Sequence, residues 1–232
     1  MRFVLVVVIL LVLCASENEA QETSTFQVWF EETAATRLGD RWWGDLMLTQ
    51  YLVNGSRQVN SISVAPRIQY SLFSWMLAET ALFAEYSSQT DISDIVEIRP
   101  WVALRYTEVF GRLEPSAMVR LEFRYLYYTE SDTWDDRYRL RIRLGTRVAL
   151  SNERIAPDTW YGIGEVEFFR NLDDAPKEYF NSRIRLHVGL GYRIGDFWST
   201  ELHYMYQESR SYPDQPFDSS DNILRVSVRK FF

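Results

Sequence analysis

Arginine occurs at every second position from Arg137 to Arg143, within the segment "RYRLRIRLGTRV" (137–148). Guanidinium groups bind carboxylates and phosphates through paired hydrogen bonds, so a row of them could bind or conduct anions. The same row could instead form ion pairs with the protein's own acids. Glutamates with this spacing occur in neighbouring segments, at Glu122, Glu165 and Glu167.

The two histidines are the other groups that could do chemistry. His187 lies two positions after Arg185, and His203 lies two positions after Glu201. A general base needs a partner within hydrogen-bond reach and access to a substrate, and neither is evident here. We therefore expect both histidines to belong to a polar network, with an enzyme as the less favoured alternative. No spacing typical of metal ligands occurs, so we expect no catalytic residue, no metal and no cofactor.

The element that positions the arginines must be a strand. On a helix, an advance of about 100° per residue would scatter the four side chains around the axis. On a strand, all four share one face, and Tyr138, Leu140 and Ile142 share the other. Such a strand belongs either to a soluble sandwich or to a transmembrane barrel that is apolar outside and polar inside.

The start of the chain indicates export. Residues 3–14 are the only long apolar run, and twelve residues are too few to cross a bilayer as a helix. With Arg2 ahead of it, the run is typical of a secretory signal peptide. We place cleavage near Ala20, with Ser16 as the alternative, which leaves 21–232 as one domain. Cys14, the only cysteine, is then lost with the signal; the alternative is a lipoprotein acceptor.

Alternating segments recur along the rest of the chain, separated by short and longer connections in turn. Outer-membrane barrels have this rhythm, with tight turns at one end and longer loops at the other. The longer connections are predicted near 53–59, 87–94, 130–136, 171–180 and 209–221. The predicted strands are 26–36, 42–52, 60–71, 75–86, 95–107, 117–129, 137–150, 159–170, 181–194, 197–208 and 222–232.

Two further features favour the barrel. Tryptophans follow four of the five short connections, as expected for an aromatic girdle at a membrane interface; they are Trp42, Trp43, Trp75, Trp160 and Trp198. The last strand ends in Phe232, which resembles the terminal signal that outer-membrane barrels present to their assembly machinery.

We therefore predict an all-β fold, a transmembrane antiparallel up-and-down β-barrel of 10–12 strands with a polar, arginine-rich lumen. Arginines on the lipid face would cost about 2–4 kcal/mol each at the midplane, so they must face inward. Since single-chain bacterial barrels have even strand numbers, we expect 10 or 12. Segment 26–36 would start at the end with the longer loops, so either it is not a wall strand or one strand has been missed or merged.

The sequence resembles a family of small bacterial outer-membrane proteins, number 2490 in the domain-of-unknown-function series. The similarity rests on "EVEFFRNL" (165–172) and "YFNSRIRLHVGLGYRIG" (179–195), and on the patterns of "QVWFE" (27–31) and "APRIQYSL" (65–72). The resemblance implies a barrel in the outer membrane of a diderm bacterium and supplies no catalytic residues. A weaker architectural similarity links the chain to small monomeric porins for acidic sugars.

Strict alternation assigns more arginines than acids to the lumen. The predicted inward arginines are Arg67, Arg99, Arg105, Arg120, Arg124, Arg137, Arg139, Arg141, Arg143, Arg147, Arg183, Arg185, Arg193, Arg225 and Arg229. The predicted inward acids are Asp45, Glu79, Glu85, Glu97, Glu122, Glu165, Glu167 and Glu201. The candidate anion path consists of Arg99, Arg105, Arg120, Arg124, Arg137, Arg139, Arg141, Arg143, Arg183 and Arg185 with Glu122, Glu165 and Glu167.

Three functions remain open at this point. The lumen could be filled by an Arg/Glu network in a non-enzymatic barrel, since buried charges are expected to pair. It could instead be a narrow anion-preferring channel, because rows of arginine lower the barrier for anions. An outer-membrane enzyme is the third. The expected partners are outer-membrane lipid, lipopolysaccharide and the assembly machinery; nucleic acid is not expected, and the protein is expected to be a monomer.

Overall fold

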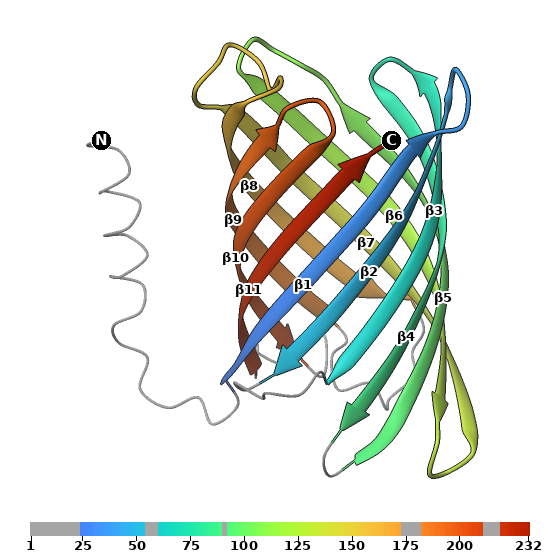
Figure 1. The fold of residues 1–232 in the computed structure, drawn as a ribbon. Helices are drawn as coiled ribbons and strands as arrows, with labels where there is room; N and C mark the ends of the chain where they lie inside the picture. Colours follow the sequence, from blue (N-terminus) through green and yellow to red (C-terminus); the bar gives the residue numbers. More distant parts are fainter. Residues whose placement is uncertain (1–23, 54–59, 90–91, 173–181, 211–218) are drawn as a thin grey trace.

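Each of the eleven segments with alternating polarity forms a β-strand, and the strands close into a barrel (Figure 1). The computed structural model describes residues 24–53, 60–89, 92–172, 182–210 and 219–232. The strands are β1 (Ser24–Arg37), β2 (Trp42–Val53), β3 (Ser61–Phe73), β4 (Met76–Gln89), β5 (Ile92–Thr107), β6 (Leu113–Tyr128), β7 (Thr133–Ala149), β8 (Thr159–Asn171), β9 (Ser182–Ile194), β10 (Trp198–Arg210) and β11 (Ser219–Phe231).

The barrel closes where the first strand meets the last. All strands that are consecutive in sequence pair antiparallel, whereas β1 and β11 pair parallel, from Ser24↔Ser220 to Ala35↔Phe231. The all-β barrel is thus confirmed, but an even strand number is wrong for the described residues, which form eleven strands. An odd number of consecutive antiparallel strands leaves the first and last running in the same direction, so the closing pair has to be parallel. Segment 26–36 is therefore a wall strand, and no additional strand is needed.

The two ends of the barrel carry different connections. The turn end carries the C-terminus and the connections 38–41, 74–75, 108–112, 150–158 and 195–197. The opposite end, here called the loop end, carries the remaining connections and the start of β1 (Figure 1). The longer connection predicted near 87–94 is wrong in extent, because β4 continues to Gln89 and β5 begins at Ile92. The predicted signal peptide lies outside the described residues.

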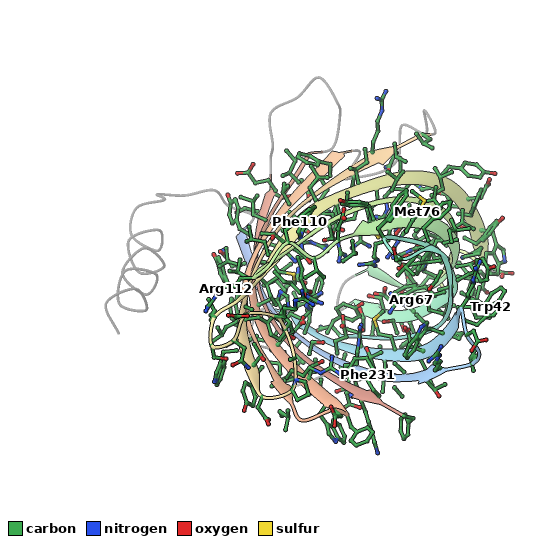
Figure 2. All side chains as sticks on the ribbon, turned by 90° about the horizontal axis from the view of Figure 1, so that it is seen from above. Trp42, Arg67, Met76, Phe110, Arg112 and Phe231 are labelled. Carbon is green, nitrogen blue, oxygen red and sulfur yellow. The ribbon has the colours of Figure 1, made fainter. Side chains whose placement is uncertain are left out.

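Alternation along each strand separates an outer apolar face from an inner polar face. Seen along the barrel axis, Arg67 lies inside the ring of strands and Trp42 lies on its outer side (Figure 2). On β7, Ile142 and Leu144 are exposed on the outer face, while Arg137 and Arg139 are buried. Among the described residues, no helix has the length and apolar character needed to cross a membrane.

Aromatic side chains gather on the outer face at the turn end. Trp42 packs against Tyr70 with ring centroids 4.6 Å apart, and Trp160 packs against Tyr192 at 4.7 Å. Trp75 and Trp198 are also exposed there. The fifth predicted tryptophan differs, because Trp43 pairs with Gln69 and has the parity of the inner face. Trp43 is thus the one member of the predicted girdle that does not belong to it.

Candidate functional site: the barrel lumen

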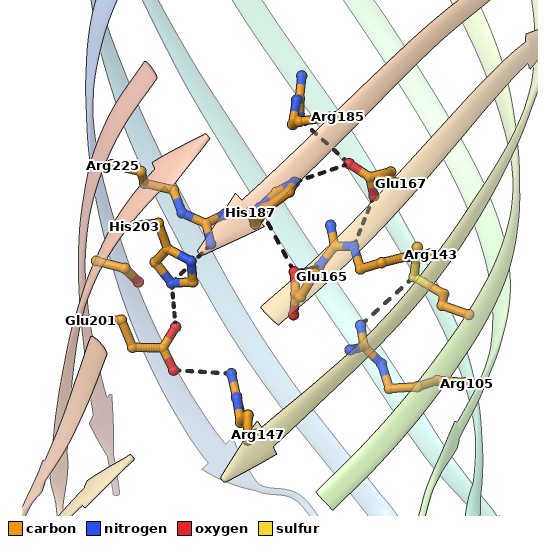
Figure 3. A network of polar contacts seen from close by, with 12 residues as sticks. Arg105, Arg143, Arg147, Glu165, Glu167, Arg185, His187, Glu201, His203 and Arg225 are labelled. Atoms are coloured by element: carbon orange, nitrogen blue, oxygen red, sulfur yellow. Dashed lines mark hydrogen bonds and ion pairs between the residues drawn. The ribbon is translucent and has the colours of Figure 1, made fainter. Parts of the chain in front are cut away.

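Contacts between strands that are not neighbours identify the interior. Arg147 on β7 donates a hydrogen bond to Glu201 on β10 at 2.9 Å, and Tyr161 on β8 donates to the same carboxylate at 2.8 Å (Figure 3). Arg185 on β9 lies over the ring of Trp29 on β1, with its guanidinium carbon 5.1 Å from the centroid. These side chains reach each other only through the lumen.

Glu122 on β6 binds arginines from its own strand and from β7. Its carboxylate oxygens lie 2.5 Å from Arg139, 3.5 Å from Arg120 and 3.6 Å from Arg141. The alternation noticed in the sequence thus brings successive arginines of β7 to one carboxylate. Because Glu122 and Arg139 are directly opposite in the β6–β7 register, the strand pairing itself sets this contact.

Glu167 on β8 is a second centre of this kind. It accepts hydrogen bonds from Nε of Arg143 at 2.8 Å and from Arg141, and it lies 3.4 Å from Arg185 on β9. Arg141 also contacts Glu122, so it links the two carboxylates. The two centres therefore form one network that spans β6 to β9.

Smaller clusters line the opposite wall. Glu97 accepts hydrogen bonds from Nη2 of Arg99 at 2.6 Å and from Nε of Arg124 at 2.7 Å. Glu79 accepts one from Nε of Arg105 at 2.7 Å and lies 3.8 Å from Arg67. Each of these carboxylates is again shared between two arginines.

Acids and arginines in this network differ in their access to water. The side chains of Glu122 and Glu167 are 0% exposed, and that of Glu79 is 1% exposed. Their partners Arg105 and Arg143 keep 24% and 17% of their side-chain surface accessible. The carboxylates lie behind the guanidinium groups, so the accessible surface of the network is mainly cationic.

Inward aromatic rings support several guanidinium groups. The guanidinium carbon of Arg120 lies 3.9 Å from the ring centroid of Trp101, and that of Arg99 lies 4.3 Å from the centroid of Phe83. The ring of Phe169 has guanidinium groups near it from Arg139, Arg141, Arg183 and Arg185. Cation–π contacts hold a guanidinium without neutralising its charge, so these arginines keep their positive field.

Inward glycines make room for large polar side chains on the next strand. A Cβ on Gly191 would lie 2.3 Å from the ring of Tyr161, its register partner. A Cβ on Gly145 would lie 2.8 Å from Glu165, which is also its register partner. Gly145 is the residue that interrupts the arginine row of β7, and the structure explains that interruption by the space Glu165 needs.

The histidines are buried in the same network. Their rings lie 6.4 Å apart, and Nε2 of His203 lies 2.9 Å from Glu201 and 3.1 Å from Arg225. Nδ1 of His187 lies 3.8 Å from Glu165. Among the described residues, neither histidine is hydrogen-bonded to a hydroxyl group that could act as a nucleophile, and no group of acids and histidines could hold a metal ion.

The structure places the predicted site residues together on the inner face. Arg183 donates a hydrogen bond to Ser209 at 3.1 Å, and Arg137 donates to Asp135. The other residues of the predicted path belong to the clusters already described. Whether they conduct an anion is a separate question, which the geometry alone does not answer.

Four inward acids were missed by the sequence reading: Glu31, Glu114, Asp135 and Asp221. The last three fall in segments predicted to be turns or loops, and the strands extend into those segments. Glu31 lies on β1, whose place in the wall was in doubt; it lies 3.8 Å from Arg225. These acids reduce the predicted arginine excess without removing it. Correct strand ends, combined with the same alternation, would have found all four.

Inward apolar residues were also missed. Ala65, Ala81, Phe83, Trp101, Ala103 and Met118 form a buried cluster on the lumen side of β3 to β6. Their parity matches that of the inward arginines, so alternation could have placed them. The assumption that the inner face is uniformly polar concealed them.

Comparisons with known proteins agree with the barrel. A search of curated protein sequences finds no significant match. Among solved structures, one described as the NanC porin in a rhombohedral crystal form is similar, with a TM-score of 0.54 and 12% sequence identity. The match covers 88% of this chain and 97% of that one, and at this identity it shows the fold alone. A family model, "Protein of unknown function (DUF2490)", matches residues 26–216. The chain therefore belongs to this family.

Proposed function

We propose that this protein is an integral outer-membrane β-barrel, without enzymatic activity, whose lumen gives small anions a narrow passage. The observation that carries the proposal is the unequal exposure within the ion pairs. Glu79 and Glu167 are buried, whereas Arg105 and Arg143 keep accessible surface. A permeating ion would meet guanidinium groups before carboxylates, and such a surface lowers the barrier for anions and raises it for cations.

Unpaired donors add to the support. Nε of Arg120 and Nε of Arg225 are buried and have no hydrogen-bond partner among the described residues. A buried N–H group without an acceptor is costly, so water or an anion in the lumen would satisfy it. The fold likeness to a structure titled as a porin is consistent with a passage, although it concerns that protein's activity only.

The membrane location is part of the proposal. The outer face is apolar, it carries an aromatic girdle at the turn end, and barrel closure leaves no strand edge unpaired, as hydrocarbon requires. Outer-membrane lipid and lipopolysaccharide would surround this face. Phe232, exposed at the end of the chain, would be read by the barrel-assembly machinery.

Solute uptake by proteoliposomes tests the passage. We expect glucuronate to enter faster than glucose, which has a similar size and no charge. Protein-free liposomes and liposomes with heat-unfolded protein are the controls. Equal exclusion of both solutes would indicate that the ion-pair network fills the lumen, and faster entry of glucose would contradict anion preference.

A further inference from the structure

Glu32 places a carboxyl group on the outer face of the barrel. Its neighbours along β1, Thr33 and Ala35, are buried on the inner face, and the even-numbered Phe26 and Phe30 are exposed on the outer face with it. In the proposed membrane setting, this outer face contacts lipid.

The carboxyl group lies far from both ends of the barrel. Glu32 pairs with Leu48, which is six residues along β2 from the girdle residue Trp42. Six residues of a strand tilted by about 40° span ~15 Å of depth, about half of a typical 25 Å apolar band. Phe26, six residues away in the other direction, marks a similar distance towards the loop end. Glu32 therefore lies near the middle of the band.

No other charged side chain shares this position among the described residues. Asp94, Asp136, Arg170 and Glu208 have outer-face parity, and each lies within four residues of the loop end of its strand. Lys230 lies at the turn end, with its Nζ 5.2 Å from the ring centroid of Trp198 and 4.4 Å from that of Phe232. Those charges can reach the interface, whereas Glu32 cannot.

Glu32 also lacks a partner within the chain. Among the described residues, neither its carboxyl group nor the amide of Gln50, on the outer face of the adjacent β2, forms a hydrogen bond or ion pair. Other polar groups on the outer face do: Thr80 donates to the carbonyl of Trp101 at 3.0 Å, and Tyr204 donates to Asn222. Two neighbouring polar side chains without partners thus face hydrocarbon, which is costly and typical of a functional contact.

We infer that the outer face of β1 and β2 binds a second copy of this chain, with the two Glu32 carboxyl groups facing each other. The inference rests on the membrane location proposed above. Lipid tails offer no hydrogen-bonding group at this depth, whereas a second copy related by a two-fold axis along the membrane normal presents the same carboxyl at the same depth. Two protonated carboxyl groups can each donate and accept one hydrogen bond. Gln50 of each copy adds a second polar group to the same interface.

Thiol cross-linking in membranes tests the interface. The sequence has one cysteine, Cys14, so the unmodified protein serves as the blank. We expect Glu32→Cys to give a disulfide-linked dimer on mild oxidation, because residues on the axis approach within the short distance that a disulfide needs. Thr80→Cys is the matched control, since Thr80 is exposed on the outer face, five residues from Trp75 and across the barrel wall from β1. Equal cross-linking of the two variants, or none at position 32, overturns the inference.

Two substitutions that keep the fold separate pairing from mere proximity. Glu32→Gln retains donor and acceptor and should retain the dimer, whereas Glu32→Leu should weaken it about tenfold in detergent, the loss expected for one polar pair in an apolar medium. An unchanged dimer in Glu32→Leu would contradict the inference. Anion uptake by Glu32→Leu should remain normal, so failure of the dimer leaves the channel intact. A chain that does not co-sediment with membranes would overturn both proposals.

Discussion

Glu167 accepts a hydrogen bond from Nε of Arg143 at 2.8 Å, and the carboxylate is fully buried while the guanidinium group keeps accessible surface. The same carboxylate also contacts Arg141 and Arg185. One buried acid thus compensates three arginines from two strands. The lumen owes its stability to such acids and its accessible charge to the arginines in front of them.

Glu167→Gln should strongly destabilise the barrel. The substitution leaves three buried or half-buried arginines without their shared counter-ion, and breaking a buried pair costs about 3–5 kcal/mol. The measurement is the urea midpoint of unfolding in detergent micelles, followed by the shift between folded and unfolded bands on a gel.

Glu165→Gln is the matched control for that experiment, because Glu165 is on the same strand and its Oε2 lies 3.5 Å from Arg143, a longer contact. Its midpoint should fall much less. If the two variants unfolded at the same urea concentration, shared coordination of Glu167 would not be what stabilises the network.

Gly191→Ala should destabilise the protein by about 1–3 kcal/mol through overpacking. The new methyl group would overlap the ring of Tyr161 and displace its hydroxyl from Glu201. Gly162→Ala, on the outer face of the adjacent strand, meets nothing within 4 Å and should be nearly neutral. The same unfolding assay compares the two, and equal stability would mean that Tyr161 does not occupy this space.

The parallel pairing of β1 with β11 places the start of β1 and the C-terminus at opposite ends of the barrel. An epitope inserted directly before Ser24 should therefore be on the same side of the membrane as one inserted in the connection 129–132. An epitope after Phe232 should be on the other side. Antibody binding to intact and permeabilised cells distinguishes these positions, and two terminal epitopes on one side would exclude the parallel closure.

Much of this fold follows from alternation alone. On β7, the row from Arg137 to Arg143 identifies the strand, its inner face and its outer face, because a period of two has no other regular explanation. The strand number did not follow, since the even-number rule assumes an antiparallel closing pair and β1 closes parallel to β11. Register between distant strands cannot be deduced from one sequence.

The site was predictable in kind but not in its layering. Alternation placed Glu122 and Arg141 on the same face, but it could not show that the acid lies behind the arginine. That order depends on side-chain length and on the register of β6 with β7. The apolar cluster around Trp101 and Met118 was hidden for a different reason, because inward apolar residues fit no simple polar-in rule.

Arg105→Gln should reduce anion preference. Arg105 is the more exposed partner of Glu79, and its removal would leave that carboxylate with only a 3.8 Å contact to Arg67. Arg112→Gln makes the same change of charge in the connection between β5 and β6, where the side chain is exposed. Only the first substitution should lower the anion-to-cation permeability ratio. An equal effect of both would show that the charge of the whole protein, rather than the lumen, sets selectivity.

The reversal potential of the unmodified protein in a planar bilayer, under a KCl gradient, tests the central claim most directly. A lumen whose accessible surface is cationic should give discrete openings and a reversal potential displaced towards the equilibrium potential of chloride. A displacement towards the potassium potential, or a membrane with folded protein inserted and no conductance, would contradict the account.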